Sequence, residues 1–81
     1  MTDITEHSAQ VVVRGYVAAN GATDVDVVFP QFSTVIEGAV VVANTANAVP
    51  IKTTIDELTL TISPDGNDAG AGYYKVIAWG Y

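Results

Sequence analysis

The side chains that usually carry out catalysis are sparse in this sequence. A nucleophilic hydrolase needs a nucleophile, a base and a group that orients the base. His7 is the only histidine, and none of the three serines, Ser8, Ser33 and Ser63, lies in a nucleophile-elbow motif. We therefore assign no catalytic residues, and the sequence predicts a protein that is not an enzyme.

Two acidic pairs have the residue types that glycoside hydrolysis uses. Asp24 and Asp26 are two positions apart, and Asp56 is followed by Glu57. The first pair alternates with valines, which predicts that both carboxylates point to water from one face of a strand. The second pair is typical of a turn before a strand. Both pairs are therefore interpreted as solvated surface groups.

A glycine-rich loop over residues 63–72 carries oxygen ligands of the kind that calcium prefers, namely Asp65, Asn67 and Asp68. Their spacing does not match the EF-hand, whose loop ends in a bidentate glutamate. Proline, glycine and Asn/Asp residues also specify ordinary turns. No metal and no other cofactor is predicted, and the absence of cysteine excludes disulfides and thiolate metal sites.

The charge balance and the short apolar stretches exclude two classes of partner, nucleic acids and membranes. Three basic residues face nine acidic ones, giving a net charge of −6 and a pI near 4.1. Three dispersed cations cannot form the basic face that nucleic-acid binding requires. The longest uncharged stretch with an apolar bias, residues 38–51, is too short and too polar to span a membrane.

The elements that must position any site are predicted to be strands. Val, Ile and Thr together number 28 of the 81 residues, whereas Leu occurs twice. β-Branched side chains lose rotamers in helices and pack well on pleated sheets. The chain is therefore expected to be all-β: a small antiparallel six-stranded β-sandwich or barrel over residues 10–81, preceded by an extended N-terminal arm over residues 1–9.

Alternating apolar and polar residues place the six strands. Asn20-Gly21 predicts a tight hairpin turn between the first two, and Pro50 places the fourth at an edge or bulge. Val25, Val27 and Phe29 are expected to point inward. The expected strands span residues 10–20, 23–29, 35–44, 49–55, 58–63 and 73–81.

Much of the apolar content should lie at an interface. A chain this short buries only about 60–65% of its unfolded surface when it folds alone, yet 49% of its residues are hydrophobic. The centre of the third strand, residues 39–43, is apolar on both faces, so a neighbouring subunit is expected to cover one of them. The aromatic residues of the last strand belong to the core, to a subunit interface or to a ligand-stacking surface. The expected subunit-interface residues are Tyr16, Val40, Val42, Tyr73, Trp79 and Tyr81.

Several stretches resemble a known group of proteins. They are Phe29-Pro30 followed by Phe32 and the apolar strand 35–43, the strand 58–63, and the terminal Val-Ile-Ala-Trp-Gly-Tyr of residues 76–81. This pattern, over residues 10–81, resembles the small β-sandwich modules of tailed-phage virion proteins, including capsid decoration (cement) proteins and the knobs of tail fibres. It is also similar in outline to H-type lectin domains, which are six-stranded and trimerise. None of the sugar-contacting residues of these lectins matches a position here.

The resemblance implies a homotrimeric, non-enzymatic virion component. The chain has no fibre shaft and no coiled-coil heptads, which favours a capsid decoration protein on the outer capsid surface, bound to the major capsid protein. A tail-fibre or receptor-binding module for host glycans is the alternative. The N-terminal arm is expected to reach the capsid or a neighbouring subunit. Its expected docking residues are Thr2, Asp3, Ile4, Thr5, Glu6 and His7.

Overall fold

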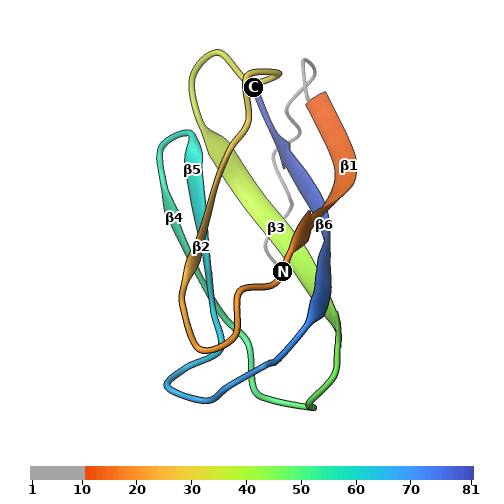
Figure 1. Ribbon diagram of the computed structural model, residues 1–81. Helices are drawn as coiled ribbons and strands as arrows, with labels where there is room; N and C mark the ends of the chain where they lie inside the picture. The colour runs from red at the N-terminus through yellow and green to blue at the C-terminus, as the bar shows by residue number, and fades with distance from the viewer. Residues whose placement is uncertain (1–10) are drawn as a thin grey trace, which may run out of the picture.

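The computed structural model describes residues 11–81, which form six strands and no helix (Figure 1). The all-β prediction is therefore confirmed for this part of the chain. The expected arm and its docking residues, including His7, lie outside the described residues. The strands are β1 (Val11–Ala18), β2 (Val25–Val28), β3 (Ile36–Thr45), β4 (Lys52–Asp56), β5 (Thr59–Ser63) and β6 (Gly72–Gly80).

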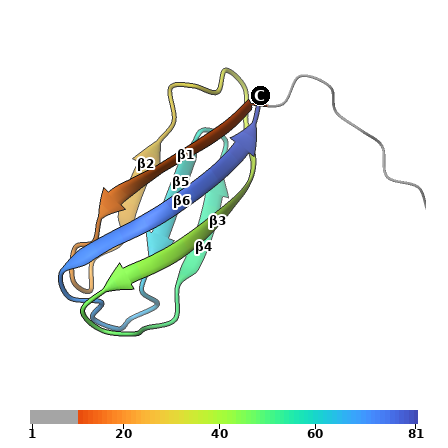
Figure 2. The ribbon, with the colours of Figure 1, turned by 90° about the vertical axis from the view of Figure 1, so that its right-hand side faces the viewer.

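The strands form two three-stranded sheets, and every pair of neighbouring strands is antiparallel. Sheet A has the order β1-β6-β3, and sheet B has the order β2-β5-β4. Figure 2 shows the three strands of sheet A side by side, with sheet B behind them. The two sheets face each other across one core. Of the sandwich and the barrel that the sequence allowed, this arrangement is sandwich-like.

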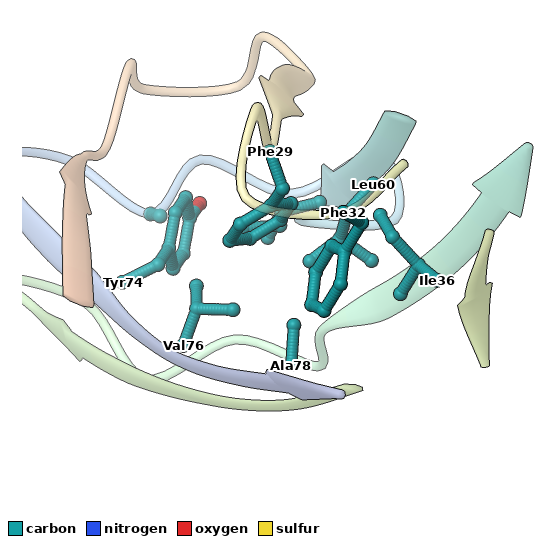
Figure 3. Close-up of a cluster of buried hydrophobic side chains, with 9 residues drawn as sticks. Phe29, Phe32, Ile36, Leu60, Tyr74, Val76 and Ala78 are labelled. Carbon is teal, nitrogen blue, oxygen red and sulfur yellow. The ribbon is translucent and has the colours of Figure 1, made fainter. Parts of the chain in front are cut away.

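The core lies between the sheets and is built from alternate residues of their central strands. Leu60 and Ile62 of β5 have no exposed surface, and Tyr74 and Ala78 of β6 have none either. Figure 3 shows Tyr74, Val76 and Ala78 pointing from β6 toward the side chains from the other sheet. Phe29 is buried as expected, and its ring lies 5.7 Å from that of Phe32. Ile36 and Ala69 complete the cluster.

The predicted hairpin between the first two strands is wrong. The turn itself is present, since the Thr23 amide donates to the Asn20 carbonyl at 2.9 Å and Gly21 has a φ of 58°. However, β1 pairs with β6, whereas β2 pairs with β5. The Asn20-Gly21 turn therefore carries the chain from one sheet to the other, because a turn signal fixes a local reversal and not the partner of the next strand.

The expected place of the fourth strand is confirmed. β4 lies at an edge of sheet B, and it begins at Lys52, so Pro50 precedes the strand and removes no hydrogen bond from the ladder. It returns to β5 through a tight turn in which Glu57 takes a φ of 55°. The acidic pair Asp56-Glu57 therefore lies at the turn before a strand, as the sequence predicted.

Tyr74 offers a test of the core. Its ring is fully buried, and its hydroxyl has no hydrogen-bond partner among residues 11–81. An unpaired buried polar group costs about 1–3 kcal/mol. We expect Tyr74→Phe to raise the free energy of unfolding by about 1 kcal/mol, measured by urea denaturation.

Tyr73→Phe is the matched control, because the exposed Tyr73 hydroxyl accepts a hydrogen bond from Asn44 Nδ2 at 2.6 Å. This variant should leave stability unchanged or lower it slightly. A lower stability for Tyr74→Phe would show that the Tyr74 hydroxyl has a partner in solution.

Candidate functional site

The outer face of sheet B is polar. Leu60 and Ile62 point into the core, so the alternating residues of β5 point outward. One of them, Thr61, donates its hydroxyl hydrogen bond to Asp26 Oδ1 at 2.8 Å, which links β5 to β2. The exposed Val28 is the one apolar residue of this face. The positions paired on this face are Asp26, Val28, Lys52, Thr54, Asp56, Thr59, Thr61 and Ser63.

The outer face of sheet A has the opposite character. Because β6 is central, each of its outward residues lies between one residue of β1 and one of β3. The four rows of this face are Val12, Trp79 and Gly38; Arg14, Ile77 and Val40; Tyr16, Lys75 and Val42; and Ala18, Tyr73 and Asn44. We call these twelve positions the A face.

The apolar residues of the A face are unusually exposed for large hydrophobic side chains. The exposed fraction is 78% for Tyr16, 60% for Val12 and 56% for Val42. Val40 and Ile77 are exposed by 51% and 43%. Single exposed apolar residues are common on proteins, but a contiguous apolar patch usually marks a binding surface. An antiparallel sheet with one hydrated face would have polar residues here, as sheet B has.

An open hollow of about 410 Å³ lies at the centre of the A face. Apolar side chains from β3 and β6 line it, and Tyr16 and the aliphatic stems of two cations contribute to its walls. The side chains that line it from the A face are Arg14, Tyr16, Val40, Val42, Lys75 and Ile77. The middle two rows of the A face therefore form a shallow site suited to apolar groups.

The charge on the A face is positive. Arg14 and Lys75 are two of the three cations of the chain. β1 and β6 contain no acidic residue, and the one acidic residue of β3, Glu37, lies in the bulge between Ile36 and Gly38. In a chain of net charge −6, this local positive charge favours a partner surface that carries carboxylates.

Aromatic rings occupy both ends of the A face. The Tyr16 and Tyr73 rings are 5.5 Å apart and tilted by 55°, and Lys75 Nζ lies 5.9 Å from the Tyr73 ring centroid. At the other end, the indole of Trp79 lies directly over Gly38, where any Cβ would collide with the ring. The indole of Trp79 therefore covers Gly38, as aromatic rings cover glycines in other sheets.

The structure brings five of the six predicted interface residues together. Tyr16, Val40, Val42, Tyr73 and Trp79 all belong to the A face. Tyr81 lies just beyond β6, where its amide donates to the Val35 carbonyl at 3.1 Å. The alternation of β6 also carried a signal for Ile77, which shares a face with Tyr73 and Trp79, but the sequence interpretation did not include it.

The other chemically suggestive residues serve local structure. Asp68 Oδ1 accepts the Gly70 amide at 2.8 Å, and Asn67 Nδ2 donates to the Pro64 and Asp65 carbonyls at 3.2 and 3.3 Å. The Ser63 hydroxyl accepts the Asp65 amide at 3.1 Å. These side chains thus stabilise the turns of their own loop. Within residues 11–81, no three His, Cys, Asp or Glu side chains gather in a way that could hold a metal ion.

Comparisons with protein-family models, with curated proteins and with solved structures found no match to this chain. Across residues 11–81, no helix has the length and apolar character needed to cross a membrane. The functional conclusion therefore depends on the geometry and chemistry of the A face.

Proposed function

We propose that this chain is a non-enzymatic structural protein of a tailed-phage virion, which decorates the outer capsid surface and stabilises the shell. In this proposal the A face packs against another protein, and the outer face of sheet B remains in water. The contrast between the two outer faces carries the protein-binding part of the proposal. The virion setting rests on the resemblance of the strand pattern to small decoration modules.

The chemistry of the A face suits a protein partner. Aromatic and aliphatic side chains with an arginine among them are the residue types enriched at the centres of protein interfaces. Arg14 and Tyr16 are neighbours of this kind on the same face. Acidic groups on the partner shell would complement Arg14 and Lys75, and would fix the register of docking more than its affinity.

Shell stabilisation follows from mass action. A protein that binds the assembled shell and not its separate subunits stabilises the assembled state by the free energy of binding. No bond is made or broken, so this role needs no catalytic group. Self-association of the chain and binding to the major capsid protein are part of the same proposal.

A glycan-binding module is the second candidate, favoured by the exposed Tyr16–Tyr73 pair beside Lys75. Aromatic faces stack on sugars as well as on proteins. Two other candidate sugar-binding elements are Trp79 and the polar loop over residues 63–72. They lie at opposite ends of β6, so they do not form one site. A saccharide response on a glycan array that Tyr16→Ala abolishes would favour this candidate.

The N-terminal arm provides one test, although it lies outside the described residues. Deleting residues 1–9 should leave the free energy of unfolding within about 0.5 kcal/mol of that of the full chain, as for surface changes. The deletion should weaken binding to particles, measured by co-sedimentation with shells stripped of the native protein. Equal decoration by the truncated and full chains would remove the arm from the docking mechanism.

Location in a native assembly tests the proposed function as a whole. Antibodies against the purified chain, used in immuno-electron microscopy of native particles, should label the outer shell. Labelling confined to the tail would favour the receptor-binding candidate, and the absence of labelling on any particle would contradict both virion proposals.

A further inference from the structure

Within residues 11–81 the two sheets have four edge strands, and β1 has the fewest features that discourage pairing. Natural proteins protect edges with charges, prolines, bulges or short strands. β2 has four residues with Asp26 among them, and β4 has five and begins at Lys52. β3 contains the bulge at Ile36/Gly38 and lies beside β4. β1 has eight residues, a regular register, no proline and one charge, Arg14.

The direction of the backbone groups of β1 follows from one hydrogen bond. The Ala19 amide donates to the Gly72 carbonyl of the chain leading into β6 at 3.0 Å. In an antiparallel pair, the residues of one strand alternate between bonding toward the partner and facing away from it. The odd-numbered residues of β1 therefore bond toward β6, and the amide and carbonyl groups of Val12, Arg14, Tyr16 and Ala18 face the free edge.

We propose that β1 pairs with β1 of a second copy, antiparallel, about a two-fold axis at Gly15. The sequence of β1 is self-complementary in this register. Arg14 lies opposite Tyr16 of the second copy, which is a cation–π pair. Val12 lies opposite Ala18, and each of these pairs exchanges two backbone hydrogen bonds. On the inner side, Val13 lies opposite Val17.

The neighbouring registers are worse. The A faces of both copies must stay on the same side of the joined sheet, so the register can shift only in steps that preserve the alternation of faces. A two-fold axis at Arg14 would place two arginines directly opposite each other, which is destabilising. An axis at Tyr16 would shorten the paired segment and leave Val12 and Val13 unpaired. Avoidance of two opposed arginines and the length of the paired segment therefore favour the axis at Gly15.

Gly15 itself supports this axis. Glycine weakens the interior of a strand and often marks close approach of another backbone. Within the described chain, a Cβ at Gly15 would meet nothing within 4 Å, so no contact in the single chain requires glycine there. At the axis, two Gly15 residues form a non-hydrogen-bonded pair, whose Cα atoms are about 4.5 Å apart.

Pairing of β1 goes beyond the proposed function, because it uses the backbone edge of a strand whose outward side chains belong to the A face. Pairing of β1 would join two copies of sheet A into one continuous sheet and place two A faces side by side, which doubles the apolar surface that one partner can cover. It also predicts a dimer, whereas the resemblance implies a trimer.

The absence of cysteine from the chain allows a direct test by single-cysteine cross-linking. Disulfides form when Cα atoms are about 4.4–6.8 Å apart, a range that includes the Gly15 pair. In a glutathione redox buffer, Gly15→Cys should give at least ten times more disulfide-linked dimer than Ala18→Cys, which is exposed on the same strand. Sedimentation equilibrium of the unmodified chain should show dimers.

Other outcomes would overturn the proposal. Preferential cross-linking of Val42→Cys would indicate that two A faces pack against each other instead. A monomer or a trimer in sedimentation would also contradict it.

If Gly15→Cys fails to fold, a mixture of Arg14→Cys and Tyr16→Cys proteins replaces it. The two variants should then form mixed disulfides in clear excess over either homodimer, and an equal distribution would overturn the register.

Discussion

Replacing Gly80 with alanine is expected to remove a large part of the stability of the domain. Gly80 is buried at the end of β6, where the backbone of residues 35–37 packs closely against it. An added Cβ would overlap the Val35 carbonyl oxygen and would lie 3.0 Å from Ile36 Cα and 3.1 Å from the Glu37 nitrogen. All three are backbone atoms, so no side chain can rotate to make room.

Gly80→Ala is expected to lower the free energy of unfolding by about 3 kcal/mol or more. Overpacking of a core typically costs about 1–3 kcal/mol, and the rigid backbone neighbours place this change at the upper end. A domain of this size has a total stability of about 4–12 kcal/mol. Gly15→Ala is the matched control in the same sheet, measured at a dilution at which the chain is monomeric, because its Cβ has open space within one chain. It should raise the free energy of unfolding by about 0.5 kcal/mol. Urea denaturation measures both variants, and a Gly80→Ala variant as stable as the parent would show that the backbone of residues 35–37 does not pack closely against Gly80.

Replacing Val40, Val42 and Ile77 together with threonine is expected to weaken partner binding about a hundredfold. Each substitution removes at least one methyl group from the A face, worth about 0.8 kcal/mol when buried. Burial of the new hydroxyls adds to the loss, and a total of about 3 kcal/mol corresponds to roughly a hundredfold change in affinity. Threonine favours strands as valine does, so the exposed positions should keep the fold.

Val28→Thr is the matched control for this variant, because Val28 is 65% exposed on the outer face of sheet B. It should bind stripped shells as the parent chain does. Co-sedimentation with shells measures binding, and fluorescence of a hydrophobic dye reports the apolar surface in the free chain. Equal binding by the triple variant and the control would exclude the A face as the docking surface.

The sequence predicts much of this fold because alternation of side chains is a local property. Leu60 and Ile62 alternate with threonines, and the structure buries both while their neighbours face water. The same pattern places Val25 and Val27 toward the core. Strand positions could therefore be predicted to within a few residues for all six strands.

The pairing of strands could not be predicted in the same way. Asn20-Gly21 specifies a turn, but whether β2 returns to β1 or crosses to the other sheet depends on which arrangement buries the most apolar surface. β1 pairs instead with β6, which lies more than fifty residues further along the chain. Such long-range pairings are a property of the whole core.

The candidate site was partly visible in the sequence. A strand that is apolar on both faces predicted that Val40 or Val42 would lack a covering layer within one chain, and both are exposed. The positive charge of the A face was not predicted. Arg14 and Lys75 are distant in sequence, and only the register of β1 with β6 places Arg14 beside Ile77 and Lys75 beside Tyr16.

The position of sheet A in a native assembly tests the central claim most directly. We expect an electron cryo-microscopy reconstruction of the particle to show the A face against density of another protein, with the polar face of sheet B toward solvent (Figure 2). Density that places the A face in open solvent, with sheet B buried instead, would contradict the account.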